Sequence, residues 1–270
     1  MNPAPRTVLL TGAAGGVGTL MLDLLPAYGY ELRALDVVPV PGVPGAVRAD
    51  LADRAALREA VRGVDAVIHL AGISLEAGFD QIVAANIVGL HHLYEAVREE
   101  GVPRVVFASS NHAVGFTPRP RDGEPRVPVA TPHRPDTYYG LSKAFGEDLA
   151  QFYWDKHGVE TVSVRIGSCF PEPLSVRMLS MWLSPADCAR LLHAALTAPE
   201  VGHTVVYGSS ANTRAFWDLS SARALGYEPV DDSEEYAEKV IAEKGIPAPG
   251  SADDLYLGGH FCVDPPRWPH

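Results

Sequence analysis

Residues 7–18 read TVLLTGAAGGVG, and this segment indicates the class of fold. A short β-rich run, Thr7–Leu10, stops at a glycine-rich turn, and Val17–Leu25 then follows a helical spacing. Glycines let the backbone approach a pyrophosphate closely, and the amide N–H groups at a helix start point toward negative charge. Phosphate is therefore expected against the turn and the helix start, at Gly12, Gly15, Gly16, Val17 and Gly18.

An acidic residue ends the second predicted strand, Glu31–Asp36. Asp36 lies about twenty residues beyond the glycines, where a carboxylate binds the ribose hydroxyls of a dinucleotide. The same carboxylate would repel a 2′-phosphate, so the sequence favours NAD over NADP. Further cofactor contacts are expected where later strands end, at Asp50, Leu51, Leu70, Ala71 and Gly72. A helix cap beside a core leucine explains Asp50 and Leu51 nearly as well.

Strand and helix patterns alternate through the first 166 residues. Strands are predicted at 46–48, 66–70, 104–108 and 161–166, and helices at 53–62, 79–100 and 138–157. Continuous apolar strands that alternate with helices indicate an α/β fold, a doubly wound parallel sheet of the Rossmann type. Beyond residue 166 helical patterns at 184–196 and 217–225 and a strand at 204–207 precede a tail that is mostly loop. We expect an NAD-binding domain over 1–166, and an interleaved substrate-binding and C-terminal lobe over 167–270.

Composition excludes several classes of protein. A net charge of -11 argues against a nucleic-acid partner, and no apolar run approaches the roughly 20 residues that span a bilayer. Cys169, Cys188 and Cys262 form no CxxC pair, and no HExxH motif is present, so neither a disulfide framework nor a metal site is expected. Free thiols and a start unlike a signal peptide favour the cytoplasm. A proline-rich loop over 118–135 is a candidate wall of a site.

A second pattern carries chemistry. Tyr139 and Lys143 stand four apart on one predicted helix, so they share a face. A nearby ammonium favours the phenolate, and we therefore expect Lys143 to lower the pKa of Tyr139. Ser110, at the end of the strand that begins at Arg104, should reach the same cleft and hydrogen-bond the reacting oxygen.

Together these motifs resemble the extended short-chain dehydrogenase/reductase superfamily. The resemblance implies that Ser110, Tyr139 and Lys143 are the catalytic triad. It implies that Lys143 also holds the nicotinamide ribose, together with Tyr139 and Ile166 at the cofactor, and that Asn86 supports the lysine.

Three further segments closely resemble the uronate dehydrogenases, which oxidise glucuronate and galacturonate with NAD: LAGIS at 70–74, FASSNH at 107–112, and the region 165–180 with RIGSC and RMLS. The resemblance implies a sugar pocket lined by Ser74, Ser110, Asn111, His112, Tyr139, Ser168 and Arg177. Arginine is suited to a carboxylate because it forms paired charge-assisted hydrogen bonds. The expected substrate is a small-molecule uronic acid, and the expected assembly is a homo-oligomer built through the long helices.

Two alternatives stay open. A nucleotide-sugar epimerase or dehydratase of the same superfamily would share the motifs but needs a larger carboxyl-terminal domain. A non-catalytic NAD-sensing protein usually lacks the tyrosine or the lysine, and this chain retains both.

Overall fold

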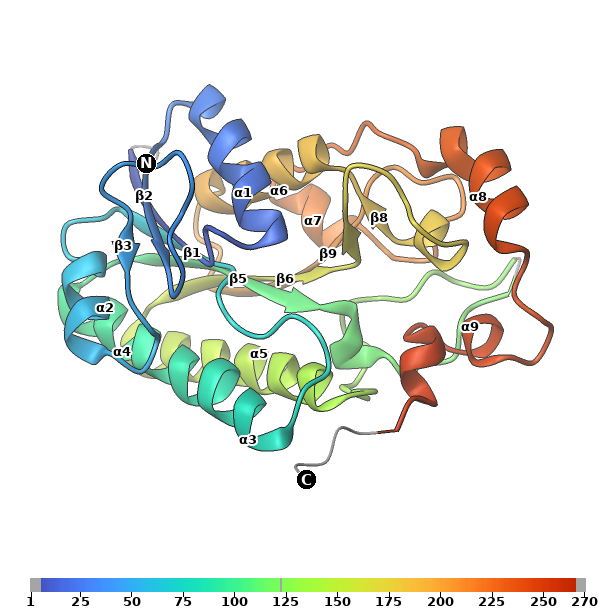
Figure 1. Ribbon diagram of the computed structural model, residues 1–270, viewed down its shortest axis with the longest axis horizontal. Coiled ribbons are helices and arrows are strands. Elements are labelled where there is room, and N and C mark those ends of the chain that lie inside the picture. Colours follow the sequence, from blue (N-terminus) through green and yellow to red (C-terminus); the bar gives the residue numbers. More distant parts are fainter. Residues whose placement is uncertain (1–5, 122, 266–270) are drawn as a thin grey trace.

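A parallel sheet of seven strands, in the order β3-β2-β1-β4-β5-β6-β9, forms the centre of the computed structural model, which describes residues 6–121 and 123–265. Figure 1 shows this sheet between two layers of helices. The order reverses direction beside β1, which is the arrangement of a doubly wound fold. The strands are β1 Thr7–Thr11, β2 Glu31–Asp36, β3 Val47–Arg48, β4 Ala66–His69, β5 Arg104–Ser110, β6 Glu160–Ile166 and β9 His203–Gly208.

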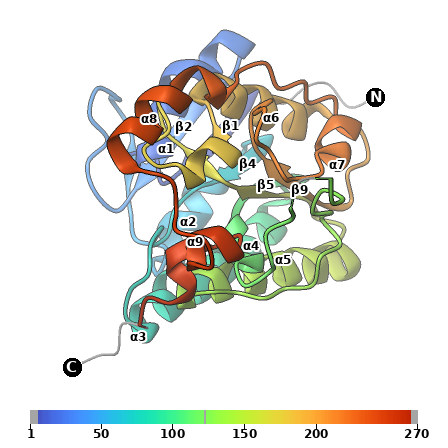
Figure 2. The same ribbon diagram turned by 90° about the vertical axis from the view of Figure 1, so that its right-hand side faces the viewer.

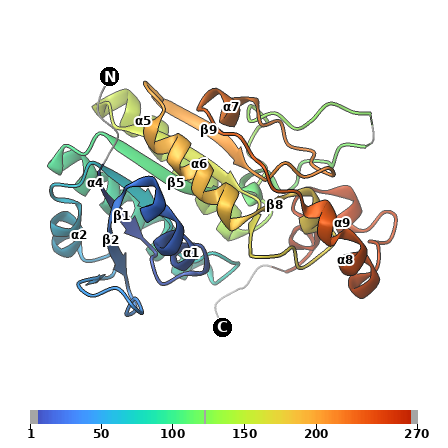
Figure 3. The same ribbon diagram turned by 90° about the horizontal axis from the view of Figure 1, so that it is seen from above.

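Helices cover both faces of the sheet, and each layer has its own apolar core. One face carries α1 Gly16–Leu24, α6 Pro185–Thr197 and α7 Ser220–Ala224, and Figure 3 shows α1 and α6 side by side over the strands. The other face carries α2 Arg54–Val61, α4 Gly89–Glu100 and α5 Tyr138–His157. Asp53 starts α2 as predicted, since its side chain accepts a hydrogen bond from the amide of Ala56.

The long helix predicted over 79–100 is continuous but not uniform. It begins as α3 Phe79–Ile82, widens into a π-helical segment, Val83–Val88, and continues as α4. Such wide turns are frequent at functional sites because they turn a side chain out of the regular ladder. Asn86 lies in this segment and its side chain faces the site described below.

The chain beyond β6 packs α6 on the sheet, adds β9 at its edge and builds one end of the molecule. A small parallel pair, β7 Ser168–Cys169 and β8 Trp182–Leu183, lies beyond the end of β6. Helices α8 Ala237–Lys244 and α9 Ala252–Leu255 follow, and Figures 1 and 2 show them together at this end.

Two sequence-based expectations need correction here. The prediction of a helix from 217 is wrong at its start, because the buried Trp217 ring stacks on Tyr207 at 4.3 Å and only Ser220–Ala224 is helical. The tail is less irregular than expected, since α9 and a 3₁₀ turn, Gly259–Cys262, lie within it. The strand pair β7–β8 was not predicted at all. Within the described residues, no helix is both long and apolar enough to cross a membrane.

Candidate active site

The glycine turn joins the carboxyl end of β1 to α1 and passes tightly against β4. Gly12 has φ +71°, and a Cβ on it would lie 2.6 Å from the backbone nitrogen of Ala71, so only glycine fits. The start of α1, at Gly15, has no side-chain cap, and its first turn holds no acidic residue. Its amide N–H groups are therefore open to a phosphate.

Asp36 lies against this turn. Its carboxylate accepts hydrogen bonds from the amides of Ala14, at 2.9 Å, and Val38, at 3.2 Å. The acid, the tight turn and the uncapped helix start thus stand together at one edge of the sheet, and this group fits a dinucleotide.

The two cofactor residues expected after the third strand behave differently. Asp50 is exposed and its carboxylate accepts from the amide of Ala52 at 2.8 Å, as in a local turn. Leu51 is buried in the core, where its side chain packs against Gly89 and its carbonyl bonds His92. Packing in the core therefore accounts for Leu51 without a contact to the cofactor.

The loop after β4 is fastened to the catalytic helix. The Asn86 amide bonds both backbone groups of Ile73, at 2.8 and 2.9 Å, and donates to the Ser142 hydroxyl at 3.0 Å. Glu76 accepts from the backbone amide of Tyr139 at 3.0 Å. Leu70, Ala71 and Gly72 precede these anchors, and Ser74 stands exposed between them.

The predicted triad comes together where β5 ends beside the first turns of α5. A hydrogen bond joins the side chains of Ser110 and Tyr139. The Lys143 ammonium donates to the carbonyl of Ala108 at 2.7 Å and lies 5.5 Å from the centre of the Tyr139 ring. The three side chains therefore lie together at the end of β5.

The charges of this group differ from the expectation. Burial raises the pKa of Tyr139 to about 12, although its hydrogen bond with Ser110 lowers it. Burial also lowers the pKa of Lys143 to about 8. The prediction that Lys143 lowers the pKa of the phenol is therefore wrong for the chain by itself, because burial raises that pKa and Lys143 is not among the groups that act on it.

A histidine and a buried carboxylate flank the phenol. His112 Nδ1 lies 2.7 Å from Asp136 Oδ2, and the His112 ring meets those of Tyr139 and Phe261 edge-on at 5.9 and 4.5 Å. Burial lowers the pKa of His112, while the hydrogen bond with Asp136 raises it.

Arg177 is buried beside Phe261, and within the described residues its guanidinium forms no salt bridge, although Asp136 and Asp253 are near enough to favour its charge. Its Nε and Nη2 atoms donate to the carbonyl of Leu257 at 3.0 and 2.8 Å. Oriented to satisfy both neighbours, the Asn111 amide donates to the Ile166 carbonyl at 3.1 Å and accepts from Arg177 Nη2 at 2.9 Å. Burial lowers the pKa of Arg177 to about 10. Ser168 is buried in β7, on the segment between Ile166 and Arg177.

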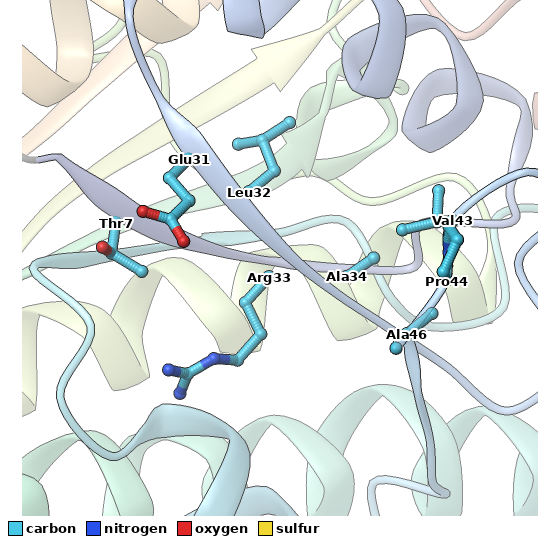
Figure 4. A pocket seen from close by; sticks show the side chains of 9 residues that line it. Thr7, Glu31, Leu32, Arg33, Ala34, Val43, Pro44 and Ala46 are labelled. Atoms are coloured by element: carbon cyan, nitrogen blue, oxygen red, sulfur yellow. The ribbon is translucent and has the colours of Figure 1, made fainter.

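Figure 4 shows a pocket elsewhere in the molecule, at the first residues of β1 and β2, away from the strand ends that carry the triad. It is lined by Thr7, Glu31, Leu32, Arg33, Ala34, Val43, Pro44, Gly45 and Ala46. None of the predicted site residues belongs to it. Within the described residues, no group of three or more histidines, cysteines or acids could hold a metal ion.

Comparison with known proteins assigns the family. The family model described as "NAD dependent epimerase/dehydratase family" matches residues 8–177. The chain belongs to this family. It is 48% identical to the uronate dehydrogenase of Pseudomonas putida over 265 residues, which is 96% of both chains.

Solved structures agree with this assignment. A uronate dehydrogenase variant from Agrobacterium tumefaciens, complexed with NAD, has a TM-score of 0.91 at 42% identity and covers 98% of this chain and 99% of its own. The glucuronic acid dehydrogenase of Chromohalobacter salexigens has a TM-score of 0.90 at 43% identity, with 97% and 98% covered. The expected fold and the resemblance to the uronate dehydrogenases are confirmed.

Several residues of the site were not predicted from the sequence. They are Glu76, Asp136, Leu257 and Phe261. Asp136 offered one signal, because it stands three residues before Tyr139, next to the N-cap of α5, Thr137. Leu257 acts through a backbone carbonyl, which no sequence pattern marks.

Proposed function

We propose that the protein oxidises the C1 hydroxyl of a cyclic hexuronic acid, D-glucuronate or D-galacturonate, to the aldarolactone, and that NAD is reduced. The observation that carries this proposal is Arg177. A buried guanidinium is costly unless an anion meets it. The protein partners of its Nε and Nη2 atoms are neutral, and no hydrogen bond within the described residues engages Nη1. Asp136 and Asp253 favour the charge of Arg177 only from beyond salt-bridge distance, and a carboxylate on the substrate supplies the direct anionic partner.

This geometry also refines how the acid is held. Because Leu257 and Asn111 occupy Nε and Nη2, the substrate carboxylate meets the guanidinium at Nη1. The carboxylate is therefore bound through Nη1, and not through the pair of guanidinium nitrogens expected from the sequence. Arg177 thereby places the acid at a fixed distance from Tyr139 and so turns C1 toward the phenol.

The chain's own residues then divide the proton chemistry. Tyr139 takes the proton of the C1 hydroxyl as general base, and Ser110 holds the C1 oxygen through the hydroxyl that already bonds the phenol. Bound NAD supplies the hydride acceptor and, in its oxidised form, a positive ring charge. Gly12, Gly15, Gly16, Val17, Gly18 and Asp36 would hold its pyrophosphate and adenosine ribose, and Lys143 its nicotinamide ribose. The lactone then opens in water.

Further parts of the proposal concern organisation. Residues 1–166 form the NAD-binding domain with the triad, and 167–270 form an interleaved segment that is mainly substrate-binding. Ser74, Asn111 and His112 of the first part and Ser168 of the second face the sugar. We place the protein in the cytoplasm. We also propose a homo-oligomer through α5, since Leu141, Phe145 and Phe152 lie on one side of that helix and are exposed. Analytical ultracentrifugation measures the assembly.

Absorbance of NADH at steady state tests the activity. Glucuronate and galacturonate are expected to be oxidised far better than glucose or galactose, and UDP-glucose is expected to be a poor substrate. Loss of a hydrogen bond with a charged partner costs roughly 1.5–3 kcal/mol, so Arg177→Ala should lower kcat/KM for the acids about ten- to a hundredfold or more. Arg177→Lys restores charge without the planar fork and should recover only part.

The neutral sugars provide the internal control, because Arg177→Ala should leave their low rates nearly unchanged. Equal rates on glucose and glucuronate, or an Arg177→Ala enzyme that still strongly prefers the acids, would contradict the proposed function.

A further inference from the structure

Asp136 is a buried carboxylate for which the proposed chemistry has no direct use. Its side chain is fully buried, and its side-chain hydrogen-bond partners are the His112 ring and the Thr137 hydroxyl, which donates to Oδ1 at 3.1 Å. We infer that Asp136 is a positioning residue that fixes the proton of His112 on Nδ1, so that Nε2 faces the sugar as a hydrogen-bond acceptor for one ring hydroxyl. This inference rests on the proposed function.

The packing around the carboxylate indicates that its place is built for it. Gly115, after β5, and Gly258, in the C-terminal segment, both lie so close to Asp136 Oδ2 that a Cβ on either would collide with it. The backbone of Gly258 also donates to the carbonyl of Gly115 at 2.9 Å. Two separate segments therefore close over the carboxylate and hold it against His112 Nδ1.

The protonation of the ring follows from this contact. An ionised carboxylate only accepts hydrogen bonds, so Nδ1 must carry the hydrogen that joins it to Asp136. Burial lowers the pKa of His112, which keeps the ring neutral and leaves a lone pair on Nε2. Arg177 and His260 are the other charged or titratable groups that act on this ring, and both disfavour its protonation.

The free nitrogen lies where a substrate is expected. No hydrogen bond within the described residues engages His112 Nε2, while the ring stands edge-on to Tyr139 and Phe261. Arg177 also lies near Phe261, with its guanidinium carbon 5.9 Å from the centre of that ring. A sugar held between Tyr139 and Arg177 thus has a hydroxyl beside Nε2, and a neutral acceptor there reads that hydroxyl as a donor.

Nuclear magnetic resonance tests the tautomer without any turnover. Long-range ¹H–¹⁵N correlation spectra distinguish a proton on Nδ1 from one on Nε2, and the signal that disappears in His112→Phe is that of His112. We expect the Nδ1–H form in the wild type, and a proton on Nε2 at neutral pH would overturn the inference. Asp136→Ala is expected to shift the ring toward the Nε2–H form.

Kinetics test the consequence. Asp136→Ala is expected to lower kcat/KM for the better uronic acid by about tenfold or more, the effect of one lost substrate hydrogen bond. In a set of monodeoxy uronic acids, one analogue should lower the kcat/KM of the wild type by the same factor as Asp136→Ala does with the full substrate. With that analogue, Asp136→Ala should lower kcat/KM little further. The His112→Phe enzyme should likewise lose little more when Asp136→Ala is added, because Asp136 acts through that ring.

A matched control separates position from burial. Asp187 is also a buried carboxylate, hydrogen-bonded in α6, and Asp187→Ala should lower stability without the analogue-dependent loss. Full additivity of Asp136→Ala and His112→Phe, or an equal loss on every deoxy analogue, would overturn the inference. If the wild type oxidised no uronic acid, the proposed function would fail while the tautomer measurement would still decide the role of Asp136.

Discussion

Tyr139 is the residue on which turnover depends in the proposed mechanism. General base catalysis contributes typically about 10²–10⁴-fold, so Tyr139→Phe should lower kcat by at least a hundredfold. NAD binding, measured by fluorescence titration, should change little, because the ring and its packing are kept.

Since burial holds the pKa of Tyr139 at about 12, oxidation should speed up as pH rises from neutrality. The rise should flatten near the pKa of Lys143, about 8, above which the ammonium loses its proton. A rate that falls with rising pH over this range would argue against a tyrosine base.

The proposed function assigns the choice of cofactor to Asp36. Its carboxylate lies at the glycine turn, bonded to the amide of Ala14. Negative charge there repels a 2′-phosphate, so Asp36→Ala should weaken NAD binding and raise the ratio of NADP to NAD turnover. Asp36→Asn is the matched variant, since it keeps an acceptor for Ala14 while it removes the charge. A wild-type enzyme that used both cofactors equally would contradict this role.

Two side chains, one at each end of the site, hold the loop between β4 and α3 in place. Asn86 fastens it at Ile73 and Glu76 fastens it to the start of α5 at Tyr139. A carboxylate at a helix N-terminus contributes about 0.3–1 kcal/mol through the helix dipole, and here it also places the loop with Ser74. Glu76→Ala should therefore raise KM for the sugar several-fold, and Glu76→Gln, which keeps an acceptor, should recover most of it. Glu59→Ala, which removes an exposed carboxylate on α2, serves as the control. An unchanged KM in Glu76→Ala would mean that Glu76 only caps the helix and does not position the loop.

Elements with a strong local signal were predictable from the sequence. The bounds of β2 and α5 agree with the prediction, because the acidic end of this strand and the capped start of this helix are set by neighbouring residues. The Ser110, Tyr139 and Lys143 cluster followed in the same way. The contacts of Arg177 did not, since Leu257 stands 80 residues further along the chain and contributes only a carbonyl. Asp136 and Phe261 meet His112 through tertiary packing of the C-terminal segment, which no local pattern encodes.

At the scale of the whole molecule, one buried ion pair joins parts that are far apart in the chain. Glu147 on α5 accepts from Arg165 on β6 at 2.8 and 2.9 Å, from Ser109 on β5 at 2.5 Å, and lies 2.8 Å from the His133 ring. Arg165 also donates to the carbonyl of Val129 at 3.1 Å. The proline-rich segment is thereby tied to the sheet directly behind the catalytic strand, which gives it a structural role beside the site.

This pair predicts how stability depends on pH. Burial by itself would raise the pKa of Glu147, but hydrogen bonds from His133 and Arg165 outweigh it and lower that pKa to about 2 from an ordinary 4.5. A lowered folded-state pKa gives stability that is complete above the unfolded value, and that is lost as pH falls from about 4.5 toward 2. Glu147→Gln leaves Arg165 buried without its partner, so it should lower the free energy of unfolding by about 3–5 kcal/mol at pH 7. Urea titrations should show that the difference in free energy of unfolding between the wild type and Glu147→Gln is smaller at about pH 3. At that pH the wild type itself loses part of the stabilisation that ionised Glu147 gives. Glu147→Gln combined with Arg165→Met should be less destabilised than Glu147→Gln alone, because the unpaired charge is gone. An equal difference in unfolding free energy at pH 7 and at about pH 3 would mean that ionised Glu147 is not the group that stabilises the contacts among α5, β5, β6 and the proline-rich segment.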